Sequence, residues 1–254
     1  MANLKGFWTL LSRETNKFIK VISQALIAPV ITSLLYIIVF GKFIGSQIPK
    51  VDDFTYIEFL IPGLIMMSVV TNSFSNTSSS ILVSKFFNNL TEMLTAPLSY
   101  FEMVLALTLG GVVRGFAVGV VTLLASVLFI PIGVFDIFVF VYFMLFVSLI
   151  FSSIGVMMGL WATQFVHLET FSNFVLTPLT FLGGVFYSIA MLPELLQTLS
   201  IFNPLLYMVN GMRYGMLGVS DISIVFSMIL VFILGSFFFG VNVWLFKLGY
   251  KIKT

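Results

Sequence analysis

The chain of 254 residues is 59% hydrophobic and only 9% charged, with a formal net charge of +2. Soluble domains carry about 25% charged residues, so this composition excludes an ordinary soluble domain and predicts an all-α integral membrane protein. The small net charge gives no reason to expect a nucleic-acid partner. The absence of cysteine excludes disulfides, thiol nucleophiles and cysteine-ligated metals.

The N-terminal arm, residues 1–20, predicts an amphipathic helix at the inner membrane surface. Its sequence MANLKGFWTLLSRETNKFIK places apolar side chains such as Trp8 and Phe18 between basic ones such as Lys17 at helical spacing. Such helices lie in the headgroup layer, which also suits the indole of Trp8. The alternative is a simple basic anchor that only sets topology.

Six segments are apolar and long enough to cross a bilayer, which takes about 20 residues. They are Val21–Phe40, Phe59–Ser80, Val112–Ile130, Ile137–Trp161, Phe171–Ser188 and Ile222–Phe246. Six spans place both termini on one side. Lysine and arginine gather in the arm and in the tail from Lys247 to Lys253, against Lys42, Lys50 and Arg213 in the opposite loops. The positive-inside rule therefore predicts that both termini are cytoplasmic.

The second span ends in an uncharged polar stretch, TNSFSNTSSS. Hydroxyls and amides recur at helical spacing at Ser68, Asn72, Ser75, Asn76 and Ser79. Such side chains can hydrogen-bond between helices, and small residues allow close helix approach. We hypothesise that this face lines the inner half of a path for an amphiphilic substrate. The alternative is a helix end that emerges into cytoplasmic water.

Arg114 is the ionisable residue that falls within a predicted span. A buried arginine costs about 2.5–3.5 kcal/mol or more, so we expect its side chain to reach the inner headgroups and support the inner edge. The alternative interpretation pairs Arg114 with Glu102 or Glu92 to brace the inner loop.

The segment 190–219, between the last two predicted spans, predicts two short helices. Pro193 suits the first turn of one helix, and Asn203-Pro204 breaks the chain before a second apolar stretch that contains Arg213. Neither piece reaches spanning length, so we expect a re-entrant hairpin in the outer leaflet. The alternative is one seventh span with a break at Asn203-Pro204.

The sequence offers no catalytic or metal-binding pattern. A GxxxxGK[ST] phosphate loop is not found, since Lys42 is followed by Phe43, and His167 has only Glu169 beside it. We expect no catalytic residue, no metal and no cofactor on this chain. A lipid-modifying enzyme would need convergent carboxylates or histidines, and an ion-coupled carrier would need buried charges or helices broken near mid-membrane.

The distal motifs LTPLTFLGGVFYS and FNPLLYMVNGMRYGMLG resemble type-2 ATP-binding-cassette (ABC) exporter permeases. The stretches FLIPGLIMMSVV and NNLTEMLTAPLSYFEMVLA fit the same family, so the resemblance covers essentially the whole chain. The motifs are most similar to bacterial permeases that export drugs, nodulation factors or cell-surface polysaccharides. The resemblance implies a single transmembrane domain, 1–254, in a bacterial inner membrane. It also implies a second permease copy, a homodimer or a heterodimer, and separate soluble ATPase subunits that bind ATP and Mg.

The same resemblance implies that the loop 85–100 contains a coupling helix near Asn88–Thr95. One apolar face of this helix would fill a groove on the ATPase, and a carboxylate beside it would pair with a basic group there. The predicted contact residues are Asn88, Leu90, Glu92, Met93, Leu94 and Pro97. One departure is ALTLGG, where many relatives have a Gly-Lys pair as the chain enters span three.

Overall fold

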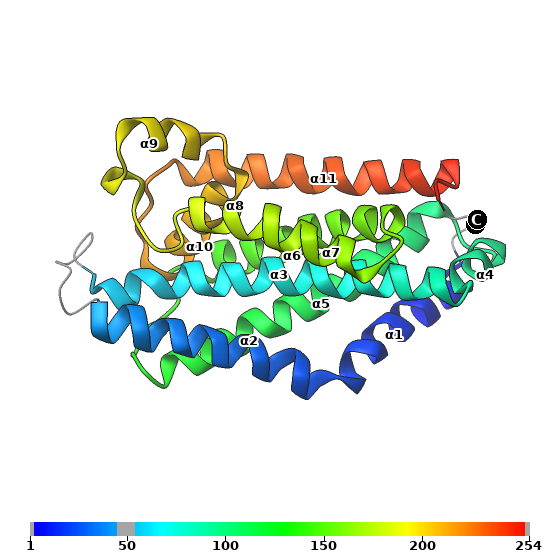
Figure 1. The fold of residues 1–254 in the computed structure, drawn as a ribbon, viewed down its shortest axis with the longest axis horizontal. Helices are drawn as coiled ribbons and strands as arrows, with labels where there is room; N and C mark the ends of the chain where they lie inside the picture. The colour runs from blue at the N-terminus through cyan, green and yellow to red at the C-terminus, as the bar shows by residue number, and fades with distance from the viewer. Residues whose placement is uncertain (1–2, 45–53, 252–254) are drawn as a thin grey trace.

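The computed structural model describes residues 3–44 and 54–251, and all the elements in these ranges are helical. The helices form an elongated bundle along one long axis (Figure 1). Lys50 and Lys253, which entered the orientation argument, lie outside the described residues.

Five helices of the described ranges are long and apolar enough to cross a membrane. They are Ile22–Gly41, which joins α2 (Ile22–Tyr36) to the π-helical η1 (Ile37–Ile44), α3 (Tyr56–Phe86), α5 (Tyr100–Val127), α6 (Ile137–Trp161) and α11 (Ile224–Leu248). Each corresponds to one of the six predicted spans; α6 has the predicted ends, and the other four have different ends.

The predicted fifth span, Phe171–Ser188, is not one regular helix. The chain instead forms α7 (Phe165–Phe171), a π-helical turn η2 (Ser172–Leu176) and α8 (Thr177–Leu182), which follow one another along the bundle (Figure 1). Pro178 in the first turn of α8 lacks the N–H that a continuous α-helix would use. Gly184, at φ +78°, turns the chain away after α8, so the predicted end at Ser188 is wrong.

The third predicted span begins much too late, because α5 starts at Tyr100 rather than Val112. Ser99 and Glu102 form a capping box, in which the serine side chain accepts from the Glu102 N–H and the Glu102 carboxylate accepts from the Ser99 N–H. Thr55 and Glu58 begin α3 in the same way. Both helices therefore begin with a capping box at their N-terminus.

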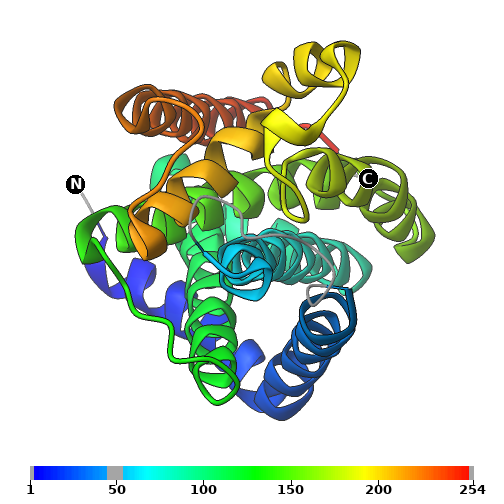
Figure 2. The same ribbon diagram turned by 90° about the vertical axis from the view of Figure 1, so that its left-hand side faces the viewer.

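The helix α3 is the centre of the bundle. Viewed along the bundle, α3 (cyan) is surrounded by the other long helices (Figure 2). In its most apolar stretch 78% of the residues are buried within the chain, compared with 17% for the first span and for α11. The first span and α11 therefore expose much of their apolar surface, to lipid or to another protein.

Small residues allow α3, α5 and α6 to pack closely. A Cβ added at Gly111 would collide with the hydroxyls of Thr77 and Ser152, and one added at Gly115 would collide with that of Ser73. These glycines are one helical turn apart on α5, so one side of α5 lies against two neighbours at once. Part of the polar stretch in span two is thus a packing surface inside this chain.

Two helices occupy the segment predicted as a hairpin. They are α9 (Glu194–Ile201) and α10 (Pro204–Leu217), which follow the short 3₁₀ turn η3 (Ile189–Met191). The Asn203 side chain accepts from the Leu205 N–H and caps α10, so the chain breaks where the sequence predicted. Neither helix reaches spanning length, and α9 lies at the end of the bundle opposite α4 (Asn89–Thr95) (Figure 1).

Candidate functional site

At the end of the bundle that carries α4, polar contacts join α1 (Leu4–Lys20) and its cap Asn3 to α4, to the segment after α4 and to α5. The Asn3 N–H donates to Glu102 Oε1 at 2.9 Å, and Asn3 Nδ2 donates to the Pro97 carbonyl at 3.2 Å. Arg13 Nη2 lies 3.0 Å from Met93 Sδ. A hollow of about 300 Å³ remains between the two helices. A partner seated here would touch α1 and α4 together.

The apolar face of α4 points into this chain, contrary to the sequence hypothesis. Leu90 and Met93 are 2% and 6% exposed, and they pack in a core with Leu10 and Met103. Leu94 is partly buried against the same core. A short amphipathic helix buries its apolar side on the nearest apolar surface, which here is α1 and α5. Leu90 and Met93 therefore lie in the interior of this chain and not on the exposed surface that the predicted ATPase contact requires.

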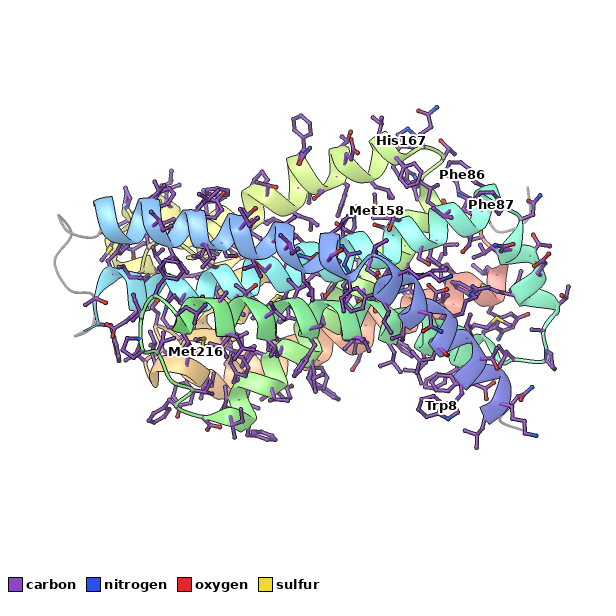
Figure 3. The ribbon with its side chains drawn as sticks, turned by 90° about the horizontal axis from the view of Figure 1, so that it is seen from below. Trp8, Phe86, Phe87, Met158, His167 and Met216 are labelled. Carbon is purple, nitrogen blue, oxygen red and sulfur yellow. The ribbon has the colours of Figure 1, made fainter. Side chains whose placement is uncertain are left out.

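The exposed side of α4 is polar. Asn88, Glu92 and Pro97 are exposed, so three of the six predicted contact residues remain available to a partner. Asn88 begins the helix in a left-handed conformation, at φ 56°. Phe86 and Phe87 at the end of α3 are 54% and 72% exposed beside this surface (Figure 3).

The five predicted path residues of α3 face different neighbours. Ser68 Oγ lies 3.1 Å from Ser33 Oγ of α2. Ser75 and Ser79 line a hollow of about 210 Å³ against α7 and η2. Asn72 lines a second hollow, of about 310 Å³, between α3 and α2. The surface between α2 and α7 is thus a strip of hydroxyls and amides, but not all five side chains point outward.

Arg114 connects α5 to two of those amides. Its Nη1 and Nη2 donate to Asn76 Oδ1 and Asn72 Oδ1 at 3.4 and 3.3 Å. Glu102 is held in its cap and by Asn3, and within residues 3–44 and 54–251 no carboxylate forms an ion pair with Arg114. The hypothesised pairing with Glu102 or Glu92 is therefore replaced by these amide contacts.

Arg114 also lines a hollow of about 190 Å³ where α1, α3 and α5 meet. Its lining residues are Glu14, Lys17, Val21, Asn76, Ser79, Ser80, Val83 and Arg114.

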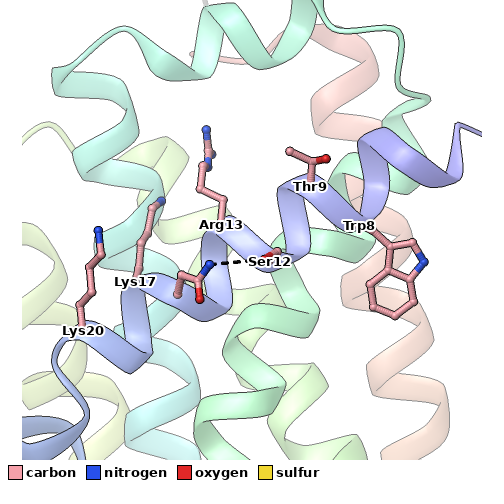
Figure 4. Close-up of a pocket in the computed structure, with 7 residues that line it drawn as sticks. Trp8, Thr9, Ser12, Arg13, Lys17 and Lys20 are labelled. Atoms are coloured by element: carbon pink, nitrogen blue, oxygen red, sulfur yellow. Dashed lines mark hydrogen bonds between the residues drawn. The ribbon is translucent and has the colours of Figure 1, made fainter.

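Glu14 is a site residue that sequence reasoning missed. Its side chain is 3% exposed, and its carboxylate accepts from Lys17 Nζ at 2.8 Å, Arg13 Nη2 at 3.1 Å and Ser80 Oγ at 2.5 Å. These contacts attach α1 to α3. The available signal was that Glu14 is the single acidic residue of a basic arm. Figure 4 shows Arg13, Lys17 and Lys20 following one another along α1.

Arg213 is a buried cation in the predicted outer hairpin. Its Nη1 donates to Asp221 Oδ2 at 2.9 Å and its Nη2 to the Gly184 carbonyl at 2.8 Å. The guanidinium carbon also lies 3.9 Å from the centre of the Phe59 ring. Arg213 thus ties α10 to α3 and to the turn after α8, which is a structural role.

Metal-ligand geometry is not found in the part of the chain that the structure describes, where no three His, Cys, Asp or Glu side chains converge. His167 accepts a hydrogen bond at Nδ1 from the Thr163 N–H, at 3.3 Å. Its ring lies 5.4 Å from that of Trp161, so it belongs to a local packing contact.

Comparisons with known proteins agree on one family. The family described as ABC-2 type transporter matches residues 5–217. The chain is 42% identical over 233 residues to the inner membrane transport permease YadH of Escherichia coli K12, covering 91% of this chain and 90% of the relative. It is 24% identical over 230 residues to nodulation protein J of Neorhizobium galegae, covering 87% and 86%.

Proposed function

The chain belongs to the ABC-2 type transporter family, and from that premise we propose that it is the permease subunit of an ATP-driven exporter in a bacterial inner membrane. Two copies form the substrate path, and separate soluble ATPase subunits bind ATP and Mg and supply the energy. The similarity to an inner membrane transport permease over 91% of the chain supports this proposal most directly.

The proposed ATPase contact is the exposed side of α4. Glu92 offers a carboxylate to a basic group on the ATPase, while Asn88, Pro97 and Phe87 surround it. Leu90 and Met93 transmit force instead of contacting the ATPase, because they attach α4 to the core of the inner end. A displacement of α4 therefore reaches α1 and α5 together.

The proposed path lies between two copies, against the strip of α3 between α2 and α7. Ser75 and Ser79 line the hollow of this strip that lies against α7 and η2, and they are uncharged. Hydroxyls can contact a polar head group without holding it as tightly as a charge would. In this proposal Asn72 and Asn76 mainly hold Arg114, and Ser68 holds α2.

The proposed topology has six spans, with α7, η2 and α8 together as the fifth, and α9 with α10 in the outer leaflet. The start of α1, α4 and the end of α11 lie at the same end of the bundle (Figure 1). The positive-inside rule makes that end cytoplasmic, because the described cations near it include Arg13, Lys17, Lys85, Lys247 and Lys251.

A pair of charge reversals tests the proposed ATPase contact. Glu92→Lys should weaken retention of the ATPase by about tenfold, because a charge-assisted contact becomes repulsive. Glu194→Lys makes the same change on the exposed side of α9 at the opposite end and should retain the partner. The measurement is the amount of ATPase that copurifies with each variant. Full retention by Glu92→Lys would overturn the assignment.

A further inference from the structure

The hollow that Arg114 lines lies at the level of the inner membrane surface. Val21, which joins the amphipathic α1 to the first membrane-spanning helix at Ile22, lines the same hollow. An amphipathic helix lies in the headgroup layer, and the span that follows it starts at the edge of the hydrocarbon. Arg114 and Lys17 therefore face the depth at which lipid phosphates lie.

This hollow has more positive than negative charge. Lys17 and Arg114 are the two cations that line it, whereas Glu14 supplies one carboxylate that Arg13, Lys17 and Ser80 already engage. Across the described ranges, no other carboxylate comes within ion-pair distance of these groups. The charges at this site are therefore not balanced, and an added anion would be attracted to it.

Arg114 lacks strong partners of its own. Its Nε is buried and has no hydrogen-bond partner, and its Nη contacts at 3.3 and 3.4 Å go to neutral amide oxygens. Contacts between arginine and an anion are shorter, about 2.7–2.9 Å, and roughly twice as strong. A largely buried guanidinium with only long, neutral contacts is suited to a ligand that brings a charge.

We propose that this hollow binds the phosphate head group of an anionic amphiphile from the inner leaflet. Arg114 contacts the phosphate oxygens from α5 and Lys17 contacts them from α1. The hollow of about 190 Å³ has the volume of roughly six water molecules, which accommodates a phosphate group. Val21 and Val83 line its apolar part, where the first carbons of the lipid would lie. The bound head group would hold α1 against α3 and α5.

The test uses the full-length permease in phosphatidylcholine nanodiscs and measures the binding of a fluorescent phosphatidylglycerol. Arg114→Gln should weaken binding by about tenfold, because one charge-assisted contact is lost. Lys17→Gln should weaken it by about fivefold. Lys5→Gln removes an exposed lysine of the same helix that does not line the hollow, so it should change binding by less than about twofold.

Wild-type affinity in both Arg114→Gln and Lys17→Gln would overturn the proposal. If Arg114→Gln does not fold, Lys17→Gln against Lys5→Gln decides alone. Inorganic phosphate should not displace the lipid at equal concentration, and displacement would show that the site takes a soluble anion instead. This readout requires neither an ATPase nor transport, so a negative result would leave the proposed exporter function untouched.

Discussion

Glu14 shows how one buried carboxylate can attach a surface helix to a membrane bundle. Glu14→Ala would leave Ser80 without its acceptor and Lys17 without its carboxylate partner, and we expect it to lower the free energy of unfolding by about 1–3 kcal/mol. This figure is modest because Arg13 and Lys17 are each 39% exposed and partly screened by water. Denaturant unfolding of the purified permease measures it.

The matched control for that experiment is Glu194→Ala, which removes an exposed carboxylate that forms no ion pair with another described residue. It should change the unfolding free energy by less than about 0.5 kcal/mol. Equal effects of the two substitutions would show that Glu14 does not stabilise the contact between α1 and α3.

A substitution at Leu90 can distinguish a structural role of this side chain from a direct contact with the ATPase. Leu90→Ala should lower the free energy of unfolding by about 2–4 kcal/mol, because the side chain is only 2% exposed in its core. Leu195→Ala, at a position that is 75% exposed, should have little effect. A stable Leu90→Ala variant that nevertheless loses the ATPase would restore the groove-filling hypothesis.

The sequence identified α4 but not its orientation. Leu90, Met93 and Leu94 do share an apolar face, as their spacing predicted, but spacing cannot say which surface covers that face. The long-range contacts of Arg114 with Asn72 and Asn76 were unpredictable for the same reason, because they join different helices. Only the relative rotation of α3 and α5 brings these side chains together.

At the scale of helices, α5 depends on glycine where it contacts α3 and α6. Gly115→Leu should prevent close packing, because even a Cβ there would collide with Ser73 Oγ. Gly240→Leu on α11 is the matched control, since nothing lies within 4 Å of its added Cβ. Gel filtration should show loss of the folded peak for Gly115→Leu alone. Equal folded yields would contradict this packing role.

Helix ends were predicted less well than helix positions. Hydropathy located all five long spans, but it does not report the π-helical turn before Pro178 or the left-handed Gly184 that interrupt the predicted fifth span. The start of α5 could have been predicted from the sequence, because Ser99 and Glu102 have the spacing of a capping box. The predicted start was too late because Arg114 was expected to lie near the inner edge of the membrane, although most of residues 100–111 are apolar.

At the scale of the whole molecule, the two ends of the bundle should face opposite sides of the membrane. Since the chain has no cysteine, single substitutions can report this directly. Thr198→Cys on α9 should react with an impermeant thiol reagent added to intact cells, whereas Thr95→Cys on α4 should react only after permeabilisation. Both residues are exposed. Labelling of both from one side would contradict the proposed topology.

The outward faces of α2 and α11 are consistent with an assembly larger than one chain. Only 17% of the residues in each apolar stretch are fully buried within the chain, so lipid or a second copy must cover the apolar side chains that remain exposed. A two-fold pairing is the commonest closed arrangement of identical subunits. Pairing along the strip of α3 between α2 and α7 would place Ser75 and Ser79 of both copies around one path.

The mass of the intact complex, extracted from native membranes and measured by native mass spectrometry, tests the central claim most directly. The proposed function predicts two permease chains together with two soluble ATPase subunits, which dissociate when Glu92 is changed to Lys. A single permease chain that carries out its transport without any ATPase partner would contradict it.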